Sequence, residues 1–568
     1  MNVTFRYSGH SALVASGAGQ ELKLAANLAR DAVAFDAGLK NPLRFREAIS
    51  TLHDVVISDL KFKPRDKSAY EAWKKDQQQR EAMIHRDAYQ RAKKEILERQ
   101  EVAVPPDFEK HYVRCRQRYW NARQKYSNYL LRHDQELWRL LMPCDPVITV
   151  ADDVVFFECF SADESSYGCL TANRDDCFGT SVNSQYGTTN VDYSWQLYHH
   201  FQKLRTYRDT RFRVDPTGFE LATTGQADYR EEKIDLPAGW LRGFMQIQSA
   251  MSLPMRRLSL GREAVYSLLA WLKRHKAQKS PRALRFELLS GKPISLILEP
   301  WEQRIVAHGN IYRGPDSEPI RVWGRQRLLV LARLLPLVER IDVYLLSTGL
   351  PSFWVAQLGD MRLTLGLSGW TTNDWTRGSA LDLLAPPALP SQDAIGRVAE
   401  AIREQRALSL DQVEGKSLTS KATCAAALSH LAHTGQIIYD LDARLYRWRQ
   451  VMPRALGEAE LGPDNEELRA SRLLVARRSV KVRSRQELGG GLRQIQGEVE
   501  SRPVELLLDA DGAIKRGKCT CSHHFKGGLR MGPCRHLLAL RSAASEAELP
   551  TDAAPDAWFE RLLRWSAN

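Results

Sequence analysis

The chain has 568 residues, too many for one hydrophobic core, and a length of this order predicts about three to five domains. Hydrophobic residues make up 43% and charged residues 26%, the balance of a soluble globular protein, and no stretch reaches the roughly 18 apolar residues of a membrane helix. The formal net charge of +13 favours polyanionic partners.

The cysteines and the first residues together predict a cytoplasmic protein with no membrane partner. The chain has 9 cysteines, an odd number, and they are too scattered to suggest a disulfide framework. The opening residues lack a basic region followed by an apolar one, so no secretory signal is expected.

The first two segments differ in their periodicity. Residues 1–66 contain short strand-like and helix-like runs and predict an N-terminal α+β segment. Residues 67–142 predict a long helical hairpin, because Ser68 and Glu71 have capping-box spacing and no Gly or Pro follows until Pro105. Its aromatic residues recur at steps of three and four, which is typical of a packed seam between two helices.

Residues 143–390 predict a mixed α+β body of one or two domains. Strand-like runs such as Val154 to Phe160 alternate with two amphipathic helices, and no sequence repeat is apparent. We find no phosphate-binding glycine loop and no acids or nucleophiles at catalytic spacing. The body is therefore expected to be a scaffold, and the protein not an enzyme. A proline-rich linker, APPALPSQ, ends the segment.

Residues 391–452 have the element order of a winged helix: three helices and then a β-hairpin. In that fold the third helix enters the major groove and the hairpin lies near phosphates. Nucleic-acid contacts are therefore expected from Lys421 on the third helix and from Arg444, Arg447 and Arg449 on the hairpin. Because the segment is only slightly basic, a protein-binding role is the alternative.

The sequence near the C-terminus contains a Cys-x-Cys pair, a glycine-containing spacer and a Cys-x-His pair. Cys519, Cys521, Cys534 and His536 supply the soft and borderline ligands of a tetrahedral zinc site. Four protein ligands leave no open position for a substrate, so we expect one structural zinc ion per chain. A redox-active cysteine cluster is one alternative, and His523 or His524 as the fourth ligand is another.

Strands are expected before the metal ligands and a helix after Pro533, so that residues 470–545 form a zinc-finger domain and 546–568 a helical tail. Between Ser471 and Arg541 there are 15 Lys and Arg against 6 Asp and Glu. Such an excess favours binding to phosphates. The expected nucleic-acid contacts in this domain are Lys515, Arg516, Lys518, Lys526, Arg530, Arg535 and Arg541.

The chain resembles bacterial SWIM zinc finger family proteins in its finger pattern and in three strings: RDAVAFDAGLKNPLRFREAISTLHDVVISDLKFKPRDKSAYEAW, VVFFECFSADESSYGCLTANRD and GTTNVDYSW. The resemblance implies a finger that binds DNA or proteins, and a link to MoxR-type AAA+ ATPases and von Willebrand A domain proteins. Ser522, His523 and His524 depart from the proline or aromatic residues that often follow the first pair in that family.

Taken together, the sequence predicts a multidomain α+β protein with a helical hairpin, a mixed α+β body, a winged-helix-like module and a C-terminal SWIM-type zinc finger. Its expected role is that of a zinc-dependent factor that binds nucleic acid, DNA in the first place, as a targeting subunit of an ATPase-linked stress or defence system. The alternative is an adaptor whose finger and winged-helix module hold protein partners such as the ATPase.

Overall fold

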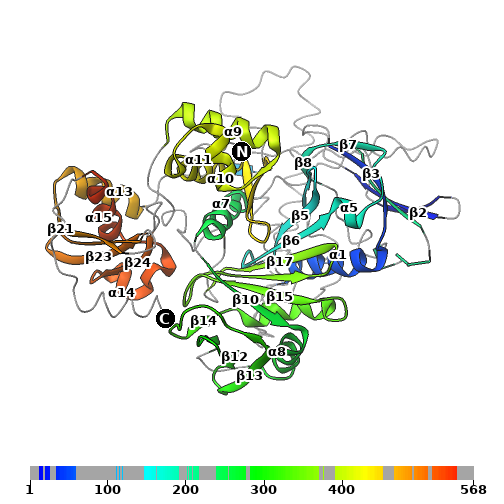
Figure 1. Cartoon of the computed structure of the whole chain (residues 1–568), viewed down its shortest axis with the longest axis horizontal. Helices are drawn as coiled ribbons and strands as arrows, with labels where there is room; N and C mark the ends of the chain where they lie inside the picture. The colour runs from blue at the N-terminus through cyan, green and yellow to red at the C-terminus, as the bar shows by residue number, and fades with distance from the viewer. Residues whose placement is uncertain are drawn as a thin grey trace. The chain divides into compact units, whose positions relative to one another are not determined.

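The computed structural model describes the chain in segments (Figure 1), and the chain divides into two compact units by its internal contacts. One unit is Leu60–Met142, and the other contains the remaining residues. The described residues are 12–16, 19–25, 33–58, 111, 114–115, 118, 146–161, 163–190, 201–202, 204–207, 209–215, 238–253, 255–276, 282–369, 375, 390–451, 466–488, 492–508 and 514–546. The predicted helical hairpin, apart from four single residues, and the predicted helical tail lie outside them.

The body begins with a five-stranded sheet. Its strand order is β1-β2-β9-β3-β7, with β2 and β9 parallel and the other neighbours antiparallel. The strands are β1 (Ala12–Ser16), β2 (Gly19–Ala25), β3 (Ala34–Leu39), β7 (Asn183–Gln185) and β9 (Thr210–Asp215). A short helix, α5 (Arg174–Cys177), leads into β7.

An eight-stranded antiparallel sheet forms the centre of the body, in the order β10-β15-β16-β17-β6-β5-β4-β8. The strands β5 and β6 are almost wholly buried, which explains their continuous apolar runs. The members are β4 (Val147–Val150), β5 (Val154–Phe160), β6 (Ser166–Asn173), β8 (Gly187–Asn190), β10 (Arg256–Gly261), β15 (Arg340–Leu345), β16 (Ser352–Gln357) and β17 (Met361–Leu367).

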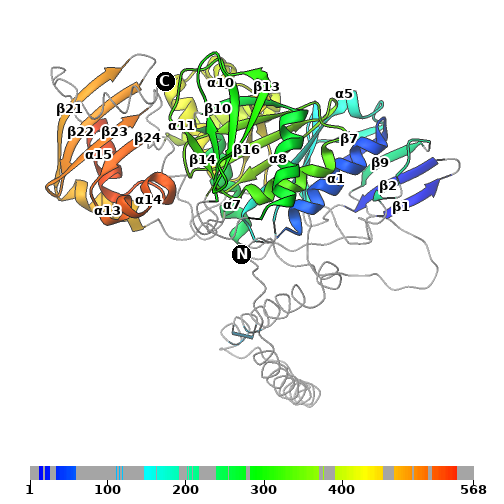
Figure 2. The ribbon, with the colours of Figure 1, turned by 90° about the horizontal axis from the view of Figure 1, so that it is seen from below.

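A third sheet of the body has four strands, in the order β13-β12-β11-β14. Three helical segments, α1, α8 and η1, accompany the sheets, and both α1 and α8 pack against η1. Figure 2 shows α1 and α8 along one side of the body. The elements are α1 (Pro42–Val56), α8 (Arg262–Arg274), β11 (Leu284–Glu287), β12 (Pro293–Leu298), β13 (Gln303–Ile311), β14 (Ile320–Val322) and η1 (Arg325–Leu334).

The body repeats one order of elements, strand–helix–three strands, although the sequence shows no repeat. It occurs as β3-α1-β4-β5-β6, as β10-α8-β11-β12-β13 and as β14-η1-β15-β16-β17. The second and third copies exchange their first strands, since β10 pairs with β15 and β14 pairs with β11. The first and third copies join through β6 and β17. The body is thus one interlocked structure, built from repeated units that the sequence does not reveal.

Residues 391–451 form a separate small module with its own core. Serines at three N-caps, Ser391, Ser409 and Ser420, each accept a hydrogen bond from a backbone N–H three residues ahead, and Ser409 with Gln412 completes a capping box. The elements are α9 (Gln392–Gln405), β18 (Ala407–Leu408), α10 (Leu410–Ser417), α11 (Lys421–His433), β19 (Ile437–Asp440) and β20 (Leu445–Trp448), with the strands in the order β18-β20-β19.

The C-terminal domain is a four-stranded antiparallel meander, β21-β22-β23-β24, with α15 packed on one face and α13 packed on α15. Gly497 and Gly517 allow this close approach, because a Cβ on either would lie within 3 Å of the Leu540 or Leu537 side chain. The elements are α13 (Glu466–Ala476), β21 (Val480–Leu488), β22 (Leu492–Val499), β23 (Arg502–Leu508), β24 (Ile514–Cys519), α14 (Ser522–Gly527), η3 (Gly528–Met531) and α15 (Arg535–Glu546).

The predicted multidomain α+β class is confirmed, with several separate sheets. Among the described residues, no helix combines the length and the apolar character that crossing a membrane requires.

Candidate metal centre and nucleic-acid interface

The four predicted metal ligands come together in the C-terminal domain. The ligand atoms of Cys519, Cys521, Cys534 and His536 lie within 4.8 Å of one another, and all four residues are buried. Cys519 ends β24, Cys521 is the N-cap of α14, and His536 lies in the first turn of α15. A buried group of three thiols and one imidazole is the donor set of a structural zinc site, and such a group could hold one ion.

The surroundings of Cys519 favour its thiolate, the form that binds metal. A hydrogen bond from the Cys534 thiol, aided by His536, lowers the pKa of Cys519, and the same contact raises the pKa of Cys534. Backbone amides also donate to sulfur: Cys521 N lies 3.5 Å from Cys519 Sγ, and His524 N lies 3.4 Å from Cys521 Sγ. These donors stabilise negative charge at the centre.

The orientation of the His536 ring indicates which nitrogen would face the ion. Its Nε2 lies 3.3 Å from Glu500 Oε2, while Nδ1 is buried without a hydrogen-bond partner among the described residues. A carboxylate that accepts from one ring nitrogen commonly orients the other toward a metal. Nδ1 of His536 is therefore the ligand atom that fits, with Glu500 as the group that holds the ring.

The two alternative histidines are outside the cluster. His523 is half-buried, and its Nε2 lies 3.4 Å from the Gly532 carbonyl oxygen. His524 is also half-buried, and burial lowers the pKa of its imidazole. Neither belongs to the group of converging ligand atoms, which consists of the four predicted residues.

An ion pair between Glu467 and Arg535 fastens α13 beside the metal cluster. Glu467 Oε2 accepts from the backbone N–H of Arg535 at 2.7 Å, and the guanidinium of Arg535 bonds to the same carboxylate. Burial alone would raise the pKa of Glu467, but Arg535 holds it below its ordinary value. Nothing in the sequence points to this contact, because the two residues lie far apart in the chain.

Two of the predicted phosphate contacts in this domain have surroundings that the sequence did not indicate, and their role in binding stays a prediction. Arg535 is engaged by Glu467, so its charge is already neutralised. Arg541 is 5% exposed, and burial lowers the pKa of its guanidinium to about 10. The Arg541 side chain is therefore packed inside the domain. By contrast Lys515 and Lys526 are exposed, and Arg516 and Lys518 are half-buried. The side chain of Arg530 is outside the described residues.

Two of the three arginines expected to contact nucleic acid from the hairpin of the module are engaged by carboxylates of the protein instead. Arg449 forms an ion pair with Glu158 of β5, and neither side chain is exposed to solvent. Arg447 is 3% exposed and bonds to Asp153 at 2.6 Å and to Asp440 at 2.9 Å. These two residues attach the module to the body and cannot reach phosphates while they do so. Arg444 is exposed, and Lys421 is exposed and paired with Asp411.

The third helix of the module, α11, is covered on both sides. One side contributes Cys424, Leu428 and Leu431 to the module core. The other side packs against α7 (Ala238–Ser252) of the body, where His433 Nε2 lies 2.6 Å from Ser249 Oγ. Packing on both sides explains why α11 is apolar around most of its circumference. In this arrangement the helix presents little surface to a DNA groove.

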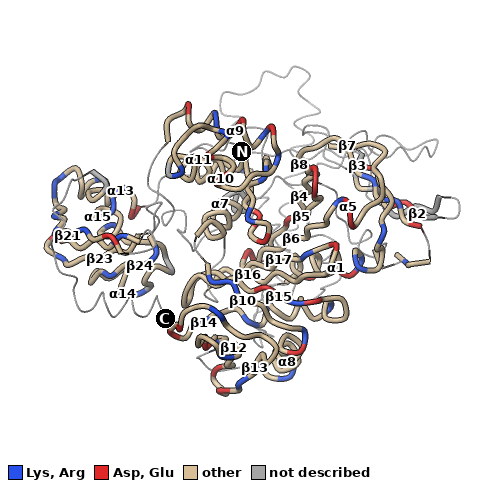
Figure 3. Tube along the Cα trace, viewed as in Figure 1, with Lys and Arg blue, Asp and Glu red and all other residues tan. Residues whose placement is uncertain are grey.

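Cations are numerous around the finger in the sequence, but the surface that concentrates them is apparent only in the structure. The end of α13 and the start of β21 carry exposed side chains of one sign, and Figure 3 shows Lys and Arg along this part of the trace. We call this the α13–β21 surface; its exposed cations are Arg469, Arg472, Arg477, Arg478, Lys481 and Arg483. Of these, Arg483 pairs with Glu498.

The comparisons with known proteins add no family. No family model matches the chain, and no curated protein matches it. A solved structure that is similar to part of it is the crystal structure of Proliferating Cellular Nuclear Antigen from Entamoeba histolytica, at 12% identity and a TM-score of 0.27, covering 40% of this chain and 91% of that one. A TM-score this low supports no statement about fold or function. The firm functional feature is therefore the buried Cys3His group, which could hold a metal ion such as zinc.

Proposed function

We propose that the protein is a zinc-binding, non-enzymatic factor that binds nucleic acid, DNA in the first place, through its C-terminal domain. The observation that carries the proposal is the placement of exposed cations on a small domain built around a buried Cys3His group. Zinc would tie β24 to the start of α15 and so fix the shape of the surface that carries Lys515 and Lys526.

We further infer that residues 391–451 are a winged-helix-like module with a protein-binding role. The order helix, short strand, two helices and hairpin, closed as a β18-β20-β19 sheet, supports this assignment. Its third helix packs on α7, and its hairpin arginines bond to the body. These contacts favour a module that holds parts of the protein together over one that reads base pairs.

One observation favours the second proposal, that the protein is an adaptor for protein partners. Phe525 in α14 is 88% exposed and Leu473 in α13 is 55% exposed, both on the C-terminal domain. Exposed large apolar side chains near cations suit a protein partner as well as a nucleic acid. A MoxR-type AAA+ ATPase or a von Willebrand A domain protein, and with it a role in stress or defence, belongs to this second proposal.

Binding titrations over a salt series test the first proposal. If about five cations meet phosphates of duplex DNA, log affinity falls against log salt with a slope near −4 to −5. Cys534→Ser, or removal of the metal by a chelator, is expected to weaken binding and flatten the slope. An affinity that depends on neither salt nor metal would leave the adaptor proposal standing.

The charge control is a double variant on the module, Arg403→Ala with Lys416→Ala. Both side chains are exposed and lie away from the C-terminal domain in sequence. The slope of log affinity against log salt for this control is expected to equal that of the unaltered protein. Lys526→Ala is expected to lower the magnitude of the slope by about one at unchanged zinc content.

A further inference from the structure

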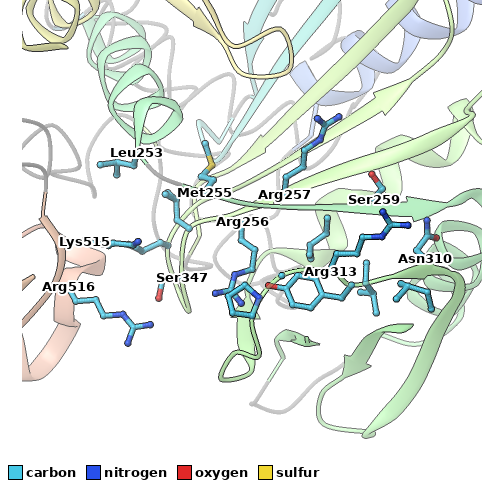
Figure 4. Close-up of a pocket in the computed structure, with 18 of the residues that line it drawn as sticks. Leu253, Met255, Arg256, Arg257, Ser259, Asn310, Arg313, Ser347, Lys515 and Arg516 are labelled. Atoms are coloured by element: carbon cyan, nitrogen blue, oxygen red, sulfur yellow. The ribbon is translucent and has the colours of Figure 1, made fainter. Parts of the chain in front are cut away.

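A cavity of about 700 Å³ lies where the body meets the C-terminal domain. Figure 4 shows its lining: β10 and the end of β13 contribute one wall, and the start of β24 contributes the other. Among the lining residues are five cations and no carboxylates. The cations are Arg256, Arg257, Arg313, Lys515 and Arg516.

On the body wall, two neighbouring arginines of β10 differ in their partners. Arg257 is paired with Asp342 of the body at 3.0 Å and with Asp442 of the module at 3.5 Å, so its charge is neutralised. Arg256 instead lies over the Tyr312 ring, with Cζ 5.9 Å from the centroid. Its Nη1 is buried and lacks a hydrogen-bond partner among the described residues. A buried guanidinium N–H without an acceptor is costly, and an anionic ligand would satisfy it.

On the facing wall, Arg516 and Lys515 come from β24. Burial lowers the pKa of Arg516, Glu318 raises it, and the positive charge of Arg256 lowers it by a smaller amount. The two guanidiniums therefore repel each other across the cavity. An anion placed between them would reduce this repulsion. It would also replace the hydrogen bonds to water that the guanidiniums lose on burial.

We propose that this cavity binds phosphate groups, and that their source is the backbone of the nucleic acid assigned above. Arg256 and Arg313 would contact phosphates from the body, and Lys515 and Arg516 from the C-terminal domain. Arginine suits this role because its planar fork donates two parallel hydrogen bonds to a phosphate. The inference rests on the proposed function and adds to it, because it makes the body part of the binding surface.

The sequence did not indicate that residues of the body line a site for phosphate. Arg256 stands next to Arg257 in a strand, and nothing in the spacing distinguishes the arginine with a buried unpaired N–H from the one paired with aspartates. A free nucleotide offers the same phosphate chemistry as a nucleic-acid backbone. The experiment therefore needs one arm for each source.

The test compares three full-length proteins: the unaltered chain, Arg256→Gln with Arg313→Gln, and the control Arg403→Gln with Lys416→Gln. Each is titrated over a salt series with duplex DNA of about two helical turns, and separately with ATP and with inorganic phosphate. Glutamine keeps a polar side chain while removing the charge. Zinc content and the thermal unfolding profile are measured on every variant, so that a folding defect is recognised.

We expect the Arg256/Arg313 variant to lower the magnitude of the salt slope for duplex DNA by about two, and the control to leave it unchanged. An unchanged slope in a folded, zinc-loaded Arg256/Arg313 variant would overturn the inference and leave the proposed function intact. Tight ATP binding that requires these arginines, with DNA binding unaffected, would overturn the nucleic-acid source. Failure of the unaltered chain to bind any nucleic acid would remove both proposals.

Discussion

Arg449 and Glu158 form an ion pair that is fully excluded from solvent, with Arg449 Nε 3.0 Å from Glu158 Oε2. Tyr167 donates to the other carboxylate oxygen at 2.8 Å, and the guanidinium lies over the Phe244 ring. Burial raises the pKa of Glu158, while Arg449 and the Tyr167 hydroxyl act against that rise. The pair joins the module to β5, so the position of the module depends on charges buried between them.

Removing one member of this pair should loosen the module. We expect Arg449→Met to destabilise the module–body contact by about 3–5 kcal/mol, because Glu158 is left buried without its cation. Hydrogen exchange of α11 and α7 amides would report the loss. The double variant Arg449→Met with Glu158→Gln should recover part of it, since no unpaired charge remains. Equal exchange rates in all three proteins would contradict the role given to the pair.

Glu500 should tune metal affinity without being a ligand. Its contact with His536 Nε2 holds the ring, and loss of such a group typically lowers metal affinity by about 10–100-fold. We expect Glu500→Gln to show that loss in competition with a chelator, at unchanged stoichiometry. Glu498→Gln is the matched control, because Glu498 pairs with Arg483 and is not among the converging ligand groups. Cys534→Ser should remove stoichiometric zinc altogether.

Acid should release the module from the body. Burial alone would raise the pKa of Asp440, but Arg362 and Arg447 hold it below the ordinary value of 3.8. A carboxyl whose pKa is depressed on folding stabilises the protein above its unfolded pKa, and that contribution is lost as the pH falls through the folded value. We therefore expect the contact to keep its strength from neutral pH to about 4.5 and to weaken below. Asp440→Asn should have a lower melting temperature than the unaltered protein at neutral pH, and its melting temperature should fall less in acid. The variant Asp393→Asn, at an exposed position, should melt like the unaltered protein at both pH values.

The packing of α15 on its sheet should be sensitive to a single methyl group. A Cβ at Gly497 would lie 2.4 Å from Leu540 Cδ1 and 2.7 Å from the Lys481 carbonyl oxygen. We expect Gly497→Ala to destabilise the C-terminal domain by about 1–3 kcal/mol. Gly396 in α9 has open space at the same position, so Gly396→Ala should stabilise its helix by about 0.5–1 kcal/mol. Denaturant titrations would give both signs.

Local patterns predicted the C-terminal domain well. The strands expected before the metal ligands are present as β22, β23 and β24, the last of which ends at Cys519. The expected helix after Pro533 is α15, which begins at Arg535. These elements depend on short-range periodicity, turn residues and ligand spacing, all of which the sequence displays.

Contacts between distant segments could not be read in the same way. Arg449 carries the positive charge expected of a phosphate contact. Only the fold, which brings it to a partner 291 positions away, shows that it is buried. Arg535 is likewise engaged by Glu467, which stands at the start of α13 and just before the expected domain boundary at residue 470. The charge of a side chain predicts that its partner has the opposite charge. The fold determines whether that partner is a ligand or another residue of the protein.

The exchange of first strands within the body also bears on how the chain reaches its native state. Arg256 at the start of β10 pairs with Leu345 at the end of β15, so the second copy cannot complete its hydrogen bonding until the third has been synthesised. Such long-range pairing raises contact order and slows folding. During translation β10 would have an unpaired edge, and a chain truncated before β15 is expected to aggregate rather than fold as a shorter protein.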